Sequence, residues 1–165
     1  MSTLVLELRQ GDMMVVNGAP IRFRNRTRIE LAAKARFLFG KQIMPPEAAT
    51  TPARRIYFAL QTAYIGTDEE RSGGLEAARA LIGEFQVATT SALAREMLRQ
   101  ALALAEADDC YQALKLARRI IRHEDAVLGR DEAGRNPPAL AAGGAARDGA
   151  SAPLLTARSP AEIKN

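Results

Sequence analysis

The spacing of apolar residues along the chain changes near residue 45. Leu4, Leu6 and Leu8 alternate with other residues, and the same period of two returns twice before residue 32. After residue 50, apolar residues recur every three or four positions. A period of two is typical of strands with one buried face, and a period near 3.6 is typical of amphipathic helices. The sequence therefore predicts an α+β fold, with a small N-terminal antiparallel sheet or barrel-like unit followed by a bundle of about four helices.

Turn residues divide the segment 3–44 into short strands. Asn17-Gly18 follows a short apolar strand at 13–16, and Asn-Gly is typical of a two-residue hairpin loop. A further strand is expected at 35–39, and 42–44 is a candidate for a last short strand. The two prolines that follow are expected to end the sheet region.

Register suggests how the strands around residues 21–24 and 28–31 pair. A three-residue loop between them sets Phe23 opposite Ile29 and Arg24 beside Arg28. This pairing keeps charged and apolar side chains on separate faces, whereas a two-residue loop would mix them. We therefore expect a local hairpin in which the two arginines face each other and leave room for an anion.

The first helix has a clear start signal. Thr51 supplies an N-cap oxygen and Pro52 occupies the first helical position, which predicts a helix through Tyr64. Gly73-Gly74 is expected to divide the following segment, so that the next helix covers about 75–87.

Two further helices are expected to form an antiparallel hairpin. Thr90 or Ser91 caps the first of them, and the second begins at Cys110 after a tight connection at 107–109. Helical spacing of apolar residues ends near residue 129.

We expect one domain and a tail. The domain covers 1–129, with a sheet part at 1–44 and a helical part at 51–129. The segment 130–165 is rich in Ala, Gly, Pro and Ser without sustained periodicity. Because such a segment buries too little apolar surface to offset ordering, we predict a disordered tail.

The charge is unevenly distributed. Residues 1–66 hold ten Lys or Arg and four Asp or Glu, a net charge of +6, whereas residues 67–129 hold eight and eleven, a net charge of −3. A basic region of this kind favours a polyanionic partner.

The basic residues of the first 66 positions form the one candidate binding site. Arginine supplies planar donors for phosphate oxygens and base edges, which points to nucleic acid. The alternative is a solvated sheet face partly neutralised by Glu7 and Glu30. Cations in the first turn of a helix oppose its dipole, so we expect Arg54-Arg55 to pair with Glu47 or acids of the tail, or to extend the patch. The candidate RNA-contacting residues are Arg22, Arg24, Arg26, Arg28, Lys34, Arg36, Arg54 and Arg55.

The polar residues argue against an enzyme. Cys110 and His123 are thirteen residues apart on one predicted helix, about 20 Å of axial rise, and cannot meet within a subunit. The chain also shows no metal-ligand cluster, no GxGxxG motif and no Walker loop. We therefore expect no catalytic activity, no metal and no cofactor.

A cytoplasmic protein is expected. The single Cys110 cannot form an intramolecular disulfide, no run of about 18 apolar residues suggests a membrane span, and no signal-peptide pattern opens the chain. We expect no membrane partner.

Three stretches of sequence point to a known family. They are Leu4-Val5-Leu6-Glu7-Leu8 followed by Gly11 and Val15-Val16-Asn17-Gly18-Ala19, then Thr51-Pro52-Ala53-Arg54-Arg55-Ile56-Tyr57-Phe58-Ala59-Leu60-Gln61, and finally Asp109-Cys110-Tyr111-Gln112-Ala113-Leu114-Lys115. On these residues, and over about 1–129, the chain resembles the FlbT family, bacterial regulators of flagellin synthesis.

The resemblance implies post-transcriptional control. Such proteins are described as acting on the 5′ untranslated leader of flagellin mRNA, lowering its translation and stability until flagellar assembly has progressed, and the regulator FlaF is the implied counterpart. It assigns no contact residues, so the arginine set above remains a physical inference. The alternative is a flagellar adaptor or chaperone-like protein whose helical half holds FlaF or flagellin, which the helical hairpin and the acid excess of 67–129 favour. The RNA sequence recognised and the oligomeric state stay open.

Overall fold

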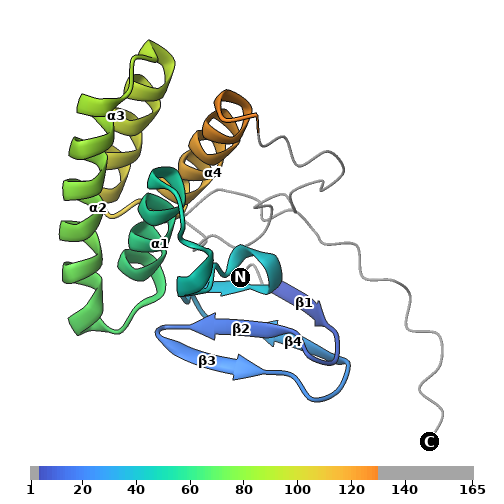
Figure 1. The fold of residues 1–165 in the computed structure, drawn as a ribbon. Helices are drawn as coiled ribbons and strands as arrows, with labels where there is room; N and C mark the ends of the chain where they lie inside the picture. Colours follow the sequence, from blue (N-terminus) through green and yellow to red (C-terminus); the bar gives the residue numbers. More distant parts are fainter. Residues whose placement is uncertain (1–3, 130–165) are drawn as a thin grey trace, which may run out of the picture.

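The computed structural model describes residues 4–129 and confirms the predicted α+β class (Figure 1). The predicted disordered tail at 130–165 lies outside the described residues. The strands are β1 (Leu4–Leu8), β2 (Met13–Val16), β3 (Ala19–Arg22), β4 (Thr27–Leu31) and β5 (Phe37–Phe39). The helices are α1 (Pro52–Ile65), α2 (Asp68–Ala88), α3 (Ala92–Glu106) and α4 (Cys110–Val127), and two short 3-10 helices, η1 (Gly40–Gln42) and η2 (Pro46–Ala48), precede α1.

The strands form two small sheets. Within residues 4–129, β1 pairs with β4 alone, and β2 lies between β3 and β5. The predicted hairpin between the strands at 21–24 and 28–31 is therefore wrong, because Ile29 lies opposite Leu6 of β1 and Arg22 lies opposite Met13 of β2. The local hairpin would leave β1 without a partner, whereas the observed pairing lets the leucines of β1 join the apolar residues of β4 in one buried layer.

The three-stranded sheet of β3, β2 and β5 packs against a different hydrophobic core on each face. Met14 and Phe37 are buried against β1 and β4. Val15 and Leu38, one residue along each strand, pack instead against the helices. Because successive strand residues point to opposite faces, the three-stranded sheet lies between the two-stranded sheet and the helical half.

The Asn17-Gly18 hairpin is confirmed. Val16 lies opposite Ala19, and Asn17 and Gly18 both have positive φ, 47° and 83°, as a type I′ turn requires. The tip packs on the turn between α1 and α2, where a Cβ on Gly18 would lie 2.9 Å from the Thr67 nitrogen. The hairpin loop thus positions the sheet against the helices.

The strand expected at 35–39 is confirmed only for its last three residues, and the candidate strand at 42–44 is wrong. Met44 has no strand partner; its N–H donates to the Gln61 Oε1 at 2.8 Å and its carbonyl accepts from the Gln61 Nε2 at 2.9 Å. The Tyr57 hydroxyl donates to the Gln42 carbonyl at 2.6 Å. Two buried side chains of α1 therefore form hydrogen bonds with backbone groups of the segment that connects β5 to α1.

Helix α1 begins as predicted. The Thr51 hydroxyl accepts from the Arg54 N–H at 3.3 Å and Pro52 is the first helical residue. Its Ile56 and Leu60 are fully buried, and the helix packs against both α2 and α4. It is the central element of the helical half.

The predicted break at Gly73-Gly74 is wrong, because α2 is continuous over 21 residues from its Thr67 cap. Gly74 is buried where α2 crosses α1, and a Cβ there would lie 2.6 Å from the Ala63 nitrogen. The glycine serves a close approach of two helices rather than a turn. The α3–α4 hairpin is confirmed, with Ser91 as the α3 cap.

Candidate nucleic-acid interface

Four of the candidate arginines lie along one strand–loop–strand segment. Arg22 ends β3, Arg24 and Arg26 lie in the connecting loop, and Arg28 lies in β4. All four are exposed. We call residues 22–28 the β3–β4 segment. Since β3 and β4 belong to different sheets, the segment joins the two sheets, and its arginines do not face one another across a hairpin.

Within this segment the arginines differ in their partners. Arg26 forms an ion pair with Glu7 of β1. Arg22 makes one contact, from Nη2 to the Met13 sulfur at 3.7 Å, which is a weak acceptor. The side chains of Arg24 and Arg28 make no hydrogen bond or ion pair within residues 4–129. Three guanidinium groups therefore point to solvent without a carboxylate partner.

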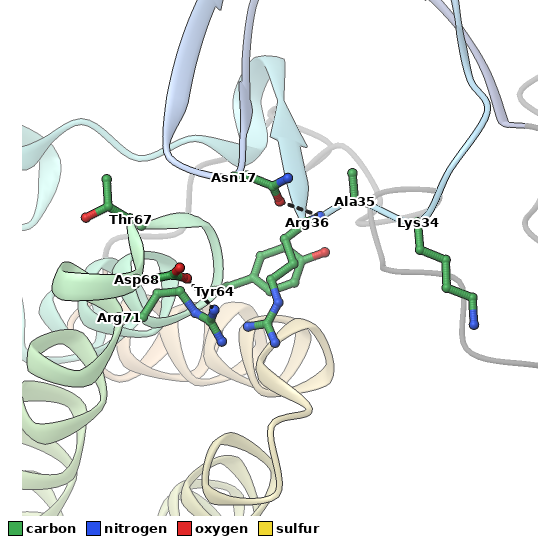
Figure 2. Close-up of a pocket in the computed structure, with 9 residues that line it drawn as sticks. Asn17, Lys34, Ala35, Arg36, Tyr64, Thr67, Asp68 and Arg71 are labelled. Atoms are coloured by element: carbon green, nitrogen blue, oxygen red, sulfur yellow. Dashed lines mark hydrogen bonds and ion pairs between the residues drawn. The ribbon is translucent and has the colours of Figure 1, made fainter.

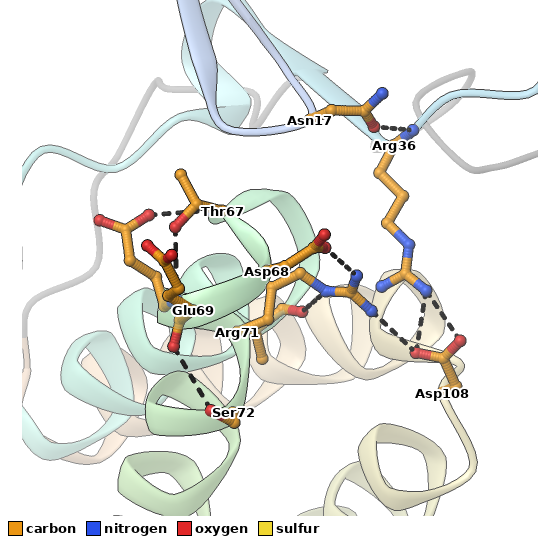
Figure 3. A network of polar contacts seen from close by, with 10 residues as sticks. Asn17, Arg36, Thr67, Asp68, Glu69, Arg71, Ser72 and Asp108 are labelled. Atoms are coloured by element: carbon orange, nitrogen blue, oxygen red, sulfur yellow. Dashed lines mark hydrogen bonds and ion pairs between the residues drawn. The ribbon is translucent and has the colours of Figure 1, made fainter.

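Arg36 is part of a network that joins the sheet half to the helical half (Figure 3). Its Nη2 lies 3.0 and 2.8 Å from the two carboxylate oxygens of Asp108, in the α3–α4 corner. Arg71 of α2 approaches the same carboxylate at 3.7 Å and also pairs with Asp68 at 3.2 Å. Asn17 accepts from the Arg36 backbone N–H at 3.2 Å. Arg36, just before β5, thus contacts the β2–β3 turn and the α3–α4 corner, and it shares Asp108 with Arg71 of α2.

A cavity of about 590 Å³ lies beside this network (Figure 2). Its lining includes Lys34, Arg36 and Arg71, which are cationic, and Asp68. Tyr64, buried from α1, also lines it. Because the two arginines are already in ion pairs, the cavity is less basic than its residue types suggest.

Arg54 joins α1 to α4 through ion pairs. Its guanidinium lies 2.8 and 3.0 Å from the two carboxylate oxygens of Asp125, and Glu124 is 3.9 Å away. Glu124 also accepts from the Ala53 N–H at 3.1 Å, so α4 acids satisfy the amino end of α1. The neighbouring Arg55 is exposed. The partners expected from the sequence were Glu47 or acids of the tail, but Arg54 pairs instead with acids of α4.

The prediction from sequence missed a basic face on α4. Its cations are Lys115, Arg118, Arg119 and Arg122. They lie three, four and seven residues apart, a spacing that places them on one side of a helix. The signal was present in the sequence, but a net charge taken over residues 67–129 hid it, because that segment also holds eleven acids.

The residues considered for catalysis are separated. Cys110 begins α4 and is buried, and burial together with Asp108 raises the pKa of its thiol. His123 lies near the other end of the same helix. No group of three or more His, Cys, Asp or Glu able to hold a metal occurs in the part of the chain from 4 to 129. In the same part, no helix combines the length and apolar character needed to cross a bilayer.

Comparison with known proteins gives a consistent result. The model of the family described as "Flagellar protein FlbT" matches residues 4–128. A probable flagellum biosynthesis repressor protein FlbT of Mesorhizobium japonicum is 30% identical over 86% of this chain and 97% of its own length. Relatives of the same name from Caulobacter vibrioides and Caulobacter sp. are 33% and 35% identical, over 79% and 76% of this chain and 93% and 96% of theirs. No solved structure matches the chain.

Proposed function

Because the chain belongs to the FlbT family of flagellar proteins, we propose that it is a post-transcriptional repressor of flagellin expression. It binds the 5′ untranslated leader of flagellin mRNA, lowers translation and promotes degradation of the message during flagellum biogenesis. The names of its relatives, flagellum biosynthesis repressors, support the regulatory part of this proposal.

The exposed cations of the β3–β4 segment support the RNA-binding part. Arg22, Arg24 and Arg28 are exposed and have no carboxylate partner within residues 4–129. Guanidinium groups in this state can donate to phosphate oxygens without first breaking an ion pair. Arg36 and Arg54 leave the proposed contact set, because their donors are engaged with Asp108 and Asp125.

A salt titration tests the RNA-binding proposal. Purified protein is titrated against fluorescent flagellin leader RNA at several salt concentrations. Binding should weaken steeply with salt, since each phosphate contact on a single strand contributes a slope of about 0.7 in log K against log salt. The R22Q/R24Q/R28Q variant should bind at least about tenfold more weakly, with a slope smaller by about 2.

A matched control removes the same charge elsewhere. R79Q/R95Q/R99Q takes three exposed arginines from α2 and α3, far in sequence from the segment, and should leave affinity and slope close to wild type. Equal losses in the two triple variants would show a general charge effect and refute the β3–β4 segment as the contact site. Absence of leader binding by the wild-type protein would refute RNA recognition itself.

An apolar hollow on the helical half favours a second candidate function, a flagellar adaptor or chaperone-like protein. A cavity of about 430 Å³ lies between α1 and α2, lined by Phe58, Leu81, Ala77 and Gly73 among others. Such a surface suits an apolar side chain of a protein such as FlaF or flagellin. On this alternative, the protein would shift leader RNA only when the protein partner is present.

A further inference from the structure

The cations of α4 form a surface separate from the β3–β4 segment. Arg119 and Arg122 are exposed, and Lys115 and Arg118 are half-buried. None of the four has a carboxylate partner among the residues that the structure describes. We call these four residues the α4 basic face.

The acids of the same helix do not neutralise this face. Glu124 accepts from the Ala53 N–H, and Asp125 holds the guanidinium of Arg54. Both are buried against α1. Both carboxylates are therefore engaged with α1, and neither forms an ion pair with a cation of the α4 basic face.

Two aromatic rings hold the inner cations in place. The Lys115 Nζ lies 4.9 Å from the centroid of the Tyr111 ring, and the Arg118 Cζ lies 5.1 Å from that of Tyr57. Arg118 also donates from Nη2 to the Lys41 carbonyl at 2.8 Å. Rings and a carbonyl orient these side chains without removing their charge. A ligand would thus meet cations whose rotamer freedom is already reduced.

This chemistry suits a chain of phosphates better than a protein. No large hydrophobic side chain of residues 115–122 is exposed, and protein interfaces normally bury an apolar core. Cations that recur about every helical turn, roughly 5 Å apart, instead suit repeating anionic groups. The exposed Lys41 in η1 extends the face toward the sheet half.

We infer that the α4 basic face binds the phosphodiester backbone of single-stranded RNA, as a second contact surface in addition to the β3–β4 segment. The inference rests on the proposed function, because the RNA is the flagellin leader named there. Arg119 and Arg122 make the outer contacts, and Lys115 and Arg118 support them from positions fixed by the tyrosines.

The test compares R119Q/R122Q with a matched control. Both arginines are exposed and make no side-chain hydrogen bond or ion pair within residues 4–129, and Gln resembles Arg in helix propensity, so the variant should fold normally. The control R79Q/R99Q removes the same charge from exposed sites on α2 and α3. Each protein is checked by circular dichroism and then titrated against fluorescent leader RNA over a series of salt concentrations.

R119Q/R122Q should weaken leader binding by about tenfold and reduce the salt slope by about 1.4. In the control variant, the change in affinity and the change in slope should each be less than half as large. If R119Q/R122Q binds like the control while R22Q/R24Q/R28Q binds weakly, the inference fails and the proposed function stands. If wild-type protein does not bind the leader, both fail. If polyglutamate at equal charge displaces the RNA from wild type but not from R119Q/R122Q, the face takes an acidic protein and the RNA assignment is overturned.

Discussion

The helical half and the sheet half use arginine in opposite ways. Between α1 and α4, Arg54 lies in bidentate contact with Asp125, and only 20% of its side chain is exposed. In the β3–β4 segment, Arg24 and Arg28 are exposed, and their side chains make no hydrogen bond or ion pair within residues 4–129. The charge of an arginine therefore does not decide whether it can meet a ligand. An arginine that is buried against a carboxylate stabilises the fold and is not available to a ligand.

Packing follows the same division. The helices approach so closely that Gly74 leaves no room for a Cβ, whereas all four residues of β3 are exposed. The helical half is thus sensitive to changes in volume and charge, and the edge of the sheet half tolerates them. This difference can be tested by substitutions of matched type in the two regions.

The largest expected effect on stability is at the ion pairs of Arg54. R54M keeps much of the apolar stem but leaves Asp125 and Glu124 buried without their cation. Breaking one side of a buried pair costs about 3 kcal/mol, which should appear as a lower urea midpoint. R55M, one residue along the same helix and exposed, should cost less than about 0.5 kcal/mol. Equal stabilities of the two variants would contradict a structural role for Arg54.

The next effect separates two adjacent glycines. G74A places a Cβ 2.6 Å from the Ala63 nitrogen and should destabilise the protein by about 2 kcal/mol through overpacking. G73A meets nothing within 4 Å and should stabilise by roughly 0.5 kcal/mol through helix propensity. Thermal unfolding of the two variants measures the difference. A G74A variant as stable as G73A would show that the helices separate easily.

A smaller effect is expected where the two halves meet, at Arg36 and Asp108. The arginine side chain is 25% exposed and the aspartate 63%, so solvent screens the pair. A double-mutant cycle of R36Q, D108N and the combined variant should give a coupling free energy of about 1 kcal/mol that falls as salt rises. A coupling near zero at low salt would mean that the network does not join the halves.

Local signals in the sequence predicted local structure. The Thr51 cap with Pro52 located the start of α1, and Asn17-Gly18 located the β2–β3 turn, because each requires only neighbouring residues. Pairing between distant strands was not predictable in this way. The hairpin expected across residues 25–27 satisfied register, but β4 pairs with β1, whose residues are 19 to 27 positions away in sequence.

The candidate site was predictable in part. The arginines of the β3–β4 segment are exposed, as a charge count suggested. Arg36 and Arg54 carry the same charge, but they pair with Asp108 and Asp125, which lie more than 70 positions away in sequence. A charge count does not predict such pairs. The α4 basic face was hidden for the converse reason. Its cations were summed with the acids of residues 67–129.

The smallest expected effect is on the stability of the RNA-binding variant itself. R22Q/R24Q/R28Q changes three exposed side chains whose only hydrogen bond or ion pair within residues 4–129 is the weak one from Arg22 to the Met13 sulfur. The free energy of unfolding should therefore change by less than about 0.5 kcal/mol, measured by urea denaturation at the salt concentration used for RNA binding. The loss of RNA affinity can then be assigned to missing phosphate contacts. A loss of stability above about 1 kcal/mol would instead place these arginines in the fold, with Arg54, and remove the distinction between the two halves.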